Sequence, residues 1–202
     1  MNNKNITSLI LAAGFSSRMG KFKPLLDYEG KSFIQNVAEK VAAVSDKIII
    51  VTGFNSAAIV EHLENRLENK VLLKIDFVFN ERFESGMFSS LKKGISNAGN
   101  PDWILYHFVD QPLLHEEFYL SFVKEVESGF DLIQPTHKGK KGHPIILGGK
   151  IIESIKSADL DKTLKILLEE TEFSTKMWEC AFPEVLKDFD LPEDLSDGGI
   201  KL

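Results

Sequence analysis

The chain has little of several features that would indicate particular classes of protein. It has a single cysteine, Cys180, so no disulfide can form within it. No run approaches the roughly 18 apolar residues of a membrane span, and no basic segment with a long apolar core stands at its start. The net charge of −6 disfavours a nucleic-acid surface, because phosphate backbones select for basic patches. We therefore expect a cytoplasmic protein whose partners include neither membrane nor nucleic acid.

No linker rich in Pro, Gly or Ser and no internal repeat divides the 202 residues, so we expect one domain, 1–202. Apolar runs typical of strands alternate with amphipathic stretches typical of helices. The expected strands are 6–13, 47–52, 75–79, 103–109, 132–134, 144–147 and 175–182. The expected helices are 32–44, 56–67, 87–98, 116–128, 150–157 and 161–170. This alternation predicts βαβ units and a mainly parallel sheet that helices cover on both faces.

The most informative segment combines a strand, a loop of small residues and several cations. The first apolar run ends at Ala12-Ala13-Gly14, where small side chains let backbone N–H groups approach an anion. Three cations follow within ten residues: Arg18, Lys21 and Lys23. A strand that leads into such a loop is typical of phosphate binding.

The spacing of this loop excludes the two common phosphate-binding motifs. Five residues separate Gly14 from Gly20 where a Walker A loop has four, and Phe22 stands where that loop needs a hydroxyl. Ser16 and Met19 occupy positions at which the dinucleotide-binding fingerprint needs glycine. Two interpretations remain: a phosphate loop of another type, or an ordinary strand-to-helix turn with solvated cations.

Residues 11–23 resemble the signature of the MobA-like nucleotidyltransferases, Leu-Ala-Ala-Gly-x-Ser-x-Arg-Met-Gly-x-x-Lys, and most closely its molybdenum cofactor cytidylyltransferase branch. Every fixed position is present. The resemblance implies a three-layer α/β/α Rossmann-like sandwich with a mainly parallel mixed sheet, of the nucleotide-diphospho-sugar transferase type. It also implies Mg²⁺-dependent transfer of a nucleotide from a nucleoside triphosphate to a phosphorylated acceptor, with release of pyrophosphate.

The same resemblance gives expectations about substrates. Ala13 stands where the guanylyl-transferring branch tends to have glycine, which favours CMP transfer from CTP. The implied acceptor is molybdopterin or molybdenum cofactor, and a molybdenum enzyme or its chaperone would be a further partner. The chain departs from the family at 158–164, where no arginine stands to bind an acceptor. The identity of the acceptor therefore stays open.

An aspartate follows directly after the apolar run that ends at Val109. Mg²⁺ prefers oxygen ligands and is often held by one or two carboxylates together with phosphate oxygens. The resemblance implies that Asp110, in Asp-Gln-Pro, is a metal ligand, although an Asp that caps the turn before Pro112 is the structural alternative. A looser match near the C-terminus implies Asp190 as the second ligand. We expect Asp194 to be only a solvated charge.

Several candidate site residues fall just past strand ends, where the ligands of α/β proteins bind. The nucleotide-binding set is Leu11, Ala12, Ala13, Gly14, Arg18, Lys23, Gly53, Asn80, Gly86, Ser90 and Asp110. The resemblance implies that Gly86 and Ser90, in Gly-Met-x-x-Ser-Leu, contact base and ribose. The alternative for this segment is a helix that Ser85 caps and that buries Met87.

The catalytic set is Arg18, Lys23 and Asp110. Arg18 is expected to bind the β- and γ-phosphates through its planar fork, and Lys23 to lie nearer the α-phosphate. The resemblance also implies that His143, in Gly-His-Pro, contacts the acceptor, although an orienting or structural histidine is the alternative.

Two other functions stay open. The first keeps the chemistry and changes the substrate, as in a sugar- or alcohol-phosphate nucleotidyltransferase or a guanylyltransferase. The second is a non-catalytic nucleotide-binding accessory protein for the maturation of molybdenum enzymes. Such a protein would bind nucleotide and metal but release no pyrophosphate.

Overall fold

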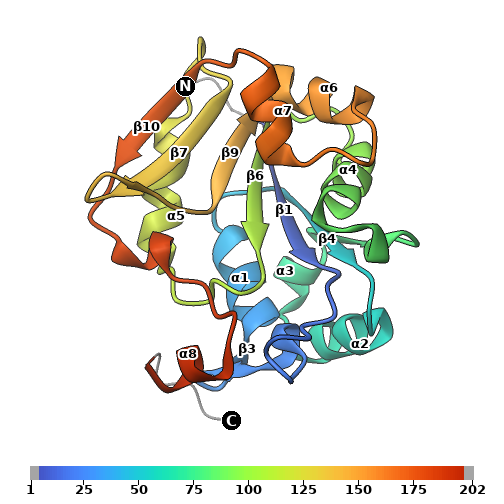
Figure 1. The fold of residues 1–202 in the computed structure, drawn as a ribbon. Helices are drawn as coiled ribbons and strands as arrows, with labels where there is room; N and C mark the ends of the chain where they lie inside the picture. The colour runs from blue at the N-terminus through green and yellow to red at the C-terminus, as the bar shows by residue number, and fades with distance from the viewer. Residues whose placement is uncertain (1–4, 198–202) are drawn as a thin grey trace.

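The computed structural model describes residues 5–197, and a mixed β-sheet runs through the centre of this part (Figure 1). Its strands are β1 (Ile6–Ala12), β4 (Lys47–Thr52), β5 (Ile75–Phe79), β6 (Trp103–Phe108), β7 (Leu132–His137), β8 (Lys140–Lys141), β9 (Ile145–Gly148) and β10 (Thr175–Glu179). The order is β10-β7-β9-β6-β1-β4-β5, and β8 pairs with β7. Two short strands, β2 (Asp27–Tyr28) and β3 (Lys31–Ser32), form a separate antiparallel pair.

The order of the strands reverses beside β1: the strands that follow it in the chain lie first on one side of it and then on the other. Strands β6, β1, β4 and β5 run parallel, whereas β9 is antiparallel to both β6 and β7. From β1 the chain moves to β4 and β5 on one side and then returns to β6 on the other. In α/β sheets, ligands bind in the crevice at such a switch, outside the carboxyl ends of the strands. The ends of β1 and β6 are therefore the expected place for a site.

Helices cover both faces of the sheet, which gives the three-layer architecture predicted from the sequence (Figure 1). The longer helices are α1 (Phe33–Val41), α2 (Ser56–Arg66), α4 (Met87–Asn97), α5 (Glu116–Phe122), α6 (Gly149–Ser157) and α7 (Leu164–Glu170). The shorter ones are α3 (Asn69–Leu72), α8 (Pro192–Asp197) and the 3₁₀ turns η1 (Lys23–Leu25), η2 (Phe83–Ser85), η3 (Val123–Glu125) and η4 (Pro183–Leu186). One core layer includes side chains of α1, α2 and α5, and the other those of α4, α6 and α7.

Strand β4 shows how the sequence produces these two core layers. Successive side chains of a strand point to opposite faces of the sheet. Ile48 and Ile50 pack in the layer with α1, whereas Ile49 and Val51 pack in the layer with α4, and all four are fully buried. A strand buried on both faces therefore reads as an unbroken apolar run, and the predicted bounds 47–52 are confirmed.

Several predicted element bounds were wrong, and in one case a side-chain cap explains the first residue of the helix. The helix expected from 161 begins at Leu164, because the Thr163 side chain accepts the backbone N–H of Ile166. The helix expected over 116–128 is α5 followed by the 3₁₀ turn η3. The strand expected over 175–182 ends at Glu179, and Cys180 behind it is buried.

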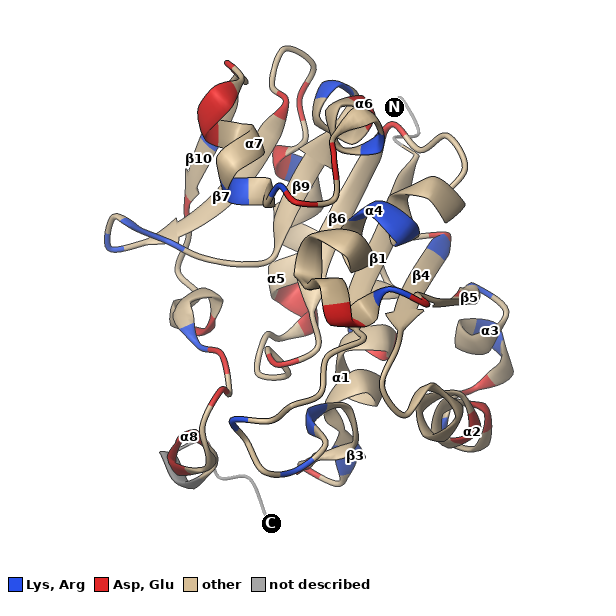
Figure 2. Cartoon of the chain, turned by 45° about the vertical axis from the view of Figure 1, so that its right-hand side comes forward, with Lys and Arg blue, Asp and Glu red and all other residues tan. Residues whose placement is uncertain are grey.

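Charged residues occur on many helices, strands and loops, and acidic and basic positions are interspersed along the chain (Figure 2). Among residues 5–197, no helix has the length and apolar character that crossing a bilayer demands.

Candidate nucleotide site

The loop after β1 is shaped by its own backbone and side chains. Ser16 adopts a left-handed conformation, with φ at 57°, and its carbonyl accepts the N–H of Met19 at 3.1 Å. The Ser16 hydroxyl accepts the N–H of Lys23, also at 3.1 Å. Met19 is 2% exposed and anchors the loop in the core. We call residues 13–22 the phosphate loop; its end delivers Lys23 to the site.

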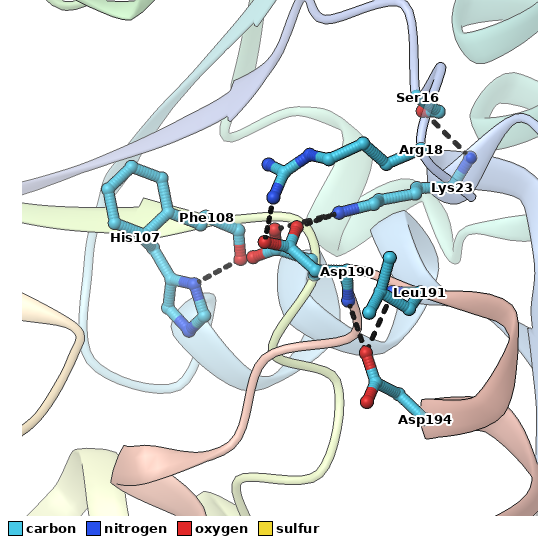
Figure 3. A network of polar contacts seen from close by, with 9 residues as sticks. Ser16, Arg18, Lys23, His107, Phe108, Asp190, Leu191 and Asp194 are labelled. Atoms are coloured by element: carbon cyan, nitrogen blue, oxygen red, sulfur yellow. Dashed lines mark hydrogen bonds and ion pairs between the residues drawn. The ribbon is translucent and has the colours of Figure 1, made fainter.

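Cations of the phosphate loop meet carboxylates from distant parts of the chain (Figure 3). The Lys23 Nζ atom lies 2.5 Å from Asp190 Oδ1 and 3.4 Å from Asp110 Oδ2. Arg18 Nη1 lies 2.7 Å from Asp190 Oδ2. The Lys23 side chain is only 11% exposed, whereas that of Arg18 is 71% exposed. Four residues that the sequence named as catalytic or metal-binding thus meet in one network.

The two carboxylates of this network differ in their surroundings. Burial raises the pKa of Asp110, and the nearby Lys23 charge opposes that rise. The hydrogen bond from Lys23 lowers the pKa of Asp190, which is more exposed. The same ammonium group thus favours the ionised form of both carboxylates, and ionised oxygens are what a hard cation binds.

Asp190 is held in place by its neighbours along the chain. The side chain of Phe189 is buried, and its N–H donates to the carbonyl of Asp110 at 3.0 Å. The Asp194 Oδ2 atom accepts the N–H of Asp190 at 2.9 Å and that of Leu191 at 2.7 Å. The expectation that Asp194 is only solvated is therefore wrong. The sequence did contain an indication of this role. Asp194 lies in the first turn of a helix that begins at Pro192, where a carboxylate can accept hydrogen bonds from free backbone N–H groups.

A cavity of about 320 Å³ opens beside this network, at the ends of β1 and β6. Ten predicted site residues line it: Leu11, Ala12, Ala13, Gly14, Arg18, Lys23, Gly86, Ser90, Asp110 and Asp190. Phe15, Phe83 and Phe108 also line it, and the sequence interpretation did not include these rings. We call this space the nucleotide cavity.

Two predicted nucleotide-binding residues lie outside the lining of the nucleotide cavity and support it from behind. A Cβ at Gly53 would lie 2.6 Å from Phe83 Cβ and 2.7 Å from the Ala13 carbonyl, so a glycine permits this close packing. Asn80 is buried, and its Nδ2 donates to the hydroxyls of Ser89 and Ser90 at 3.0 Å each. Direct nucleotide contact by Gly53 and Asn80 stays a prediction.

The start of α4 differs from the expected arrangement. Gly86 occupies the N-cap position with φ at 95°, and the Ser85 side chain makes no cap hydrogen bond. Met87 is 61% exposed, so the expectation of a core position for it is wrong. The amphipathic pattern could not reveal this, because Met87 faces a cavity that other segments create.

A second cavity of about 780 Å³ adjoins the first and shares Gly86, Met87 and Phe108 with it. His143 lines this second cavity rather than the nucleotide cavity. Its ring lies 5.1 Å from that of Phe108, edge to face, and burial lowers its pKa. Its Nδ1 atom is buried and has no hydrogen-bond partner among residues 5–197. His143 therefore stands next to the nucleotide cavity, across the shared wall.

His107 lies behind this shared wall and is completely buried. Its Nδ1 lies 2.7 Å from the Phe108 carbonyl oxygen, so Nδ1 is the donor, and Nε2 accepts from the Tyr119 hydroxyl at 2.6 Å. Burial lowers the pKa of His107 to about 3, so the ring is neutral near pH 7. The sequence assigned it no function, and its contacts are those of a structural residue.

The donor set at the network fits a magnesium ion. Asp110 and Asp190 come from different segments, and both have an oxygen within 3.5 Å of the same Lys23 nitrogen. Over residues 5–197, no group of three or more His, Cys, Asp or Glu side chains forms a complete metal site. Two carboxylates with the remaining positions left to phosphate and water are the arrangement that Mg²⁺ commonly uses.

This fold, with a phosphate loop and paired carboxylates at the switch point of the sheet, defines the class of nucleotidyltransferases. Residues 8–175 match the model of the MobA-like NTP transferase domain, and the chain belongs to that family. The recognition made from residues 11–23 is thereby confirmed.

Two curated relatives align along most of the chain. It is 25% identical to the molybdenum cofactor cytidylyltransferase of Escherichia coli, over 94% of this chain and 93% of that protein. It is 26% identical to the molybdenum cofactor guanylyltransferase of Vibrio parahaemolyticus, over 95% of this chain and 93% of that protein. Both relatives are nucleotidyltransferases, and they differ in the nucleotide named.

The fold itself matches solved structures. Rv0371c from Mycobacterium tuberculosis superposes with a TM-score of 0.80 at 20% identity, over 98% of both chains. A structure of Rv0371c in complex with manganese superposes with a TM-score of 0.75 at 17% identity, over 96% of this chain and 97% of that one. These structures confirm the predicted nucleotide-diphospho-sugar transferase type of fold.

Proposed function

We propose that this protein transfers CMP from CTP to a phosphate-bearing acceptor, molybdopterin or molybdenum cofactor, and releases pyrophosphate. The observation that carries the proposal is the network of two cations and two carboxylates beside the nucleotide cavity: Arg18, Lys23, Asp110 and Asp190. A reaction between two anionic substrates needs such charges in fixed positions. The cytidylyltransferase relative in Escherichia coli supports the choice of CTP.

The reaction needs little help in making a nucleophile. A phosphate oxygen of the acceptor attacks the α-phosphorus of CTP, the bond from that phosphorus to the β-phosphate oxygen breaks, and pyrophosphate leaves with the electron pair. A phosphate monoester is already largely deprotonated near pH 7, so no general base is required. The work of the protein is to align the two phosphates and to stabilise the added negative charge.

The residues of the network divide this work. Arg18 would bind the β- and γ-phosphates through its planar fork, and its 71% exposure leaves that fork open to an incoming ligand. Lys23 is the more buried cation and lies between the carboxylates, where it would stabilise charge on the α-phosphate. Asp110 and Asp190 would hold Mg²⁺, which supplies positive charge to the phosphate oxygens.

The second cavity supports a separate binding place for the acceptor. It adjoins the nucleotide cavity at Gly86 and Phe108, so an acceptor there would have its phosphate near the nucleotide. His143, which lines the second cavity, would contact that acceptor directly. We further propose that residues 1–202 act as one domain in the cytoplasm, with a molybdenum enzyme or its chaperone as a partner.

Calorimetric titration tests the proposal most directly. CTP, GTP, ATP and UTP would each be titrated with and without Mg²⁺ into wild type and into Asp110→Ala. We expect Mg²⁺-dependent binding of CTP that Asp110→Ala abolishes, and pyrophosphate release when molybdopterin is added. An Asp102→Ala variant, changed at an exposed position just before β6 and so at the opposite end of that strand from Asp110, is the matched control.

Each alternative predicts another result of this titration. A preference for GTP would assign the protein to guanylyl transfer, as in the Vibrio parahaemolyticus relative. Binding of CTP and Mg²⁺ without release of pyrophosphate from CTP when molybdopterin or a sugar phosphate is added would favour an accessory protein. Absence of binding by all four triphosphates would refute the nucleotidyltransferase proposal.

A further inference from the structure

Four phenylalanine rings gather along the outer edge of the phosphate loop. Phe15 lies 5.2 Å, between ring centroids, from both Phe54 and Phe83, and Phe22 lies 5.7 Å from Phe54. We call these four residues the aromatic cluster. Phe15 and Phe54 are 46% and 41% exposed, although large apolar side chains usually gain by burial. The proposed chemistry uses none of these rings.

The aromatic cluster connects residues 14–17 to the neighbouring turns, to which hydrogen bonds of these four residues do not reach. In the described part of the chain, hydrogen bonds of residues 14–17 reach only to Met19, Gly20 and Lys23, all at the far side of the same loop. The ring of Phe15 instead reaches the turn after β4 through Phe54 and the turn after β5 through Phe83. Three segments that follow neighbouring parallel strands are thus joined through one ring.

The turn that carries Phe54 is itself fixed against the loop. The N–H of Phe54 donates to the Ala13 carbonyl at 3.1 Å, directly below the ring contacts. The tight packing of Phe83 on Gly53 leaves no room for this turn to shift towards η2. Phe54 therefore offers Phe15 a rigid surface.

We propose that Phe54 is a positioning residue for nucleotide binding. It lines neither cavity, and its ring acts by holding Phe15, and with it the backbone of the phosphate loop, in the shape that receives phosphate groups. For its effect on the nucleotide, this inference rests on the proposed function. Its effect on the loop does not.

A rival explanation is that the rings touch the nucleotide directly. Phe15 and Phe83 line the nucleotide cavity, so variants of either residue would weaken binding under both explanations. Phe54 separates the two explanations, because it lines neither cavity and can affect the nucleotide only through the loop rings that it contacts, Phe15 and Phe22. Phe79 offers a matched control: it is 48% exposed, stands at the end of β5 and has no ring contact within residues 5–197.

The first test needs no nucleotide. Amide hydrogen exchange would be measured on wild type, Phe54→Leu and Phe79→Leu under identical conditions. The N–H groups of Met19 and Lys23 donate to Ser16, so their exchange reports the order of the loop. We expect both amides to exchange about fivefold faster in Phe54→Leu, which loses the ring contacts with Phe15 and Phe22, with an unchanged melting temperature. Unchanged exchange would refute the inference whatever the protein binds.

The second test measures CTP affinity in the presence of Mg²⁺. We expect about fivefold weaker binding in Phe54→Leu, restored affinity in Phe54→Tyr and wild-type affinity in Phe79→Leu. Phe15→Leu should weaken binding further, because it also removes the contact with Phe83. Adding Phe54→Leu to it should have less than its full effect, because both changes remove the same Phe15–Phe54 contact and only the contact of Phe54 with Phe22 is lost in addition. Wild-type affinity in Phe54→Leu, or fully additive effects, would refute positioning through Phe15. If wild type bound no triphosphate, the proposed function would fail while the exchange result still decided the inference.

Discussion

The two adjoining cavities are built in different ways. Most of the lining of the nucleotide cavity comes from short segments just past the ends of parallel strands, and it brings Lys23 and Asp110 together. The second cavity is more than twice as large, at about 780 Å³ against about 320 Å³. Its walls come from α4, β6, β7, β9, β10 and the segment of α7, with apolar side chains such as Leu132 and Phe173 prominent among them.

This difference explains why a sequence motif predicts the nucleotide cavity, whereas no motif predicts the second cavity. Phosphate needs small residues and charges at fixed spacing, so a contiguous loop can satisfy it. An apolar wall needs only side chains of suitable size, which many sequences provide. We therefore expect the nucleotide cavity to tolerate few changes and the second cavity to determine acceptor choice.

The largest expected effect is at Lys23. Removing a cation that stabilises transition-state charge costs about 3–4 kcal/mol, so Lys23→Ala should lower turnover about a hundredfold to a thousandfold. Lys21 is exposed and has no partner in the network, so Lys21→Ala is the control and should retain most of its turnover. Steady-state pyrophosphate release would measure both variants. More than a third of wild-type turnover in Lys23→Ala would remove Lys23 from the mechanism.

The second prediction separates the two cavities. Met177 lines only the second cavity, so Met177→Trp should raise the KM of the acceptor about tenfold and leave the affinity for CTP unchanged. Met87 lines both cavities, and Met87→Trp should weaken both substrates. Both methionines are exposed, so folding should tolerate either change. If Met177→Trp weakened CTP as much as it weakened the acceptor, the cavities would have to be treated as one site.

A smaller effect is expected at Asp194, which accepts two N–H groups beside Asp190. Asp194→Ala loses a cap worth about 1 kcal/mol, which should reduce turnover about fivefold through misplacement of Asp190. Glu193→Ala, at the exposed neighbouring position, should leave turnover unchanged. Measuring turnover against Mg²⁺ concentration checks the cause, since the Asp194 variant should need more Mg²⁺ for half-maximal rate. An unchanged Mg²⁺ requirement would contradict this explanation.

A change at His107 should have the smallest effect on the two cavities. It should instead change how the free energy of unfolding depends on pH. Its pKa is lowered by burial from 6.5 to about 3, so the unfolded chain binds a proton that the folded protein does not bind. The resulting stability is present above pH 6.5 and is lost as the pH falls towards 3, by up to about 1.4 kcal/mol per pH unit. Denaturant unfolding at several pH values would show this slope.

The matching variants isolate this contribution. His107→Gln should reduce the slope between pH 6 and pH 4, whereas His115→Gln, at an exposed position, should keep the wild-type slope. Equal slopes in wild type and His107→Gln would mean that other groups cause the acid sensitivity. Binding of CTP near pH 7 should be the same in all three proteins.

The sequence predicted the strands of the parallel half of the sheet well. The bounds 47–52 and 75–79 are confirmed, because each run is mostly apolar and is bounded at both ends by glycine or polar residues. The helix start at Leu164 was missed, since a capping hydroxyl at Thr163 outweighed the acidic residues before it. The hydrophobic pattern thus predicted which helices and strands form, whereas capping side chains determined where a helix such as α7 begins.

The candidate site was predictable only where its residues are contiguous. The motif at 11–23 named Arg18 and Lys23, but no local pattern could show that Asp190 pairs with both of them. The aromatic cluster was missed for the same reason, because Phe54 and Phe83 meet Phe15 only through the fold. Roles of the site residues in catalysis stay predictions.

The pairing of Arg18 with Asp190 also constrains when the protein can become active. These residues stand 172 positions apart, and the family match ends at residue 175, before Asp190. During synthesis, the sheet strands up to β10 leave the ribosome before this carboxylate does. A chain truncated after β10 would retain every described strand of the sheet together with Arg18, Lys23 and Asp110, and would still lack Asp190. The charge network can therefore be complete only after nearly all of the described chain has been synthesised.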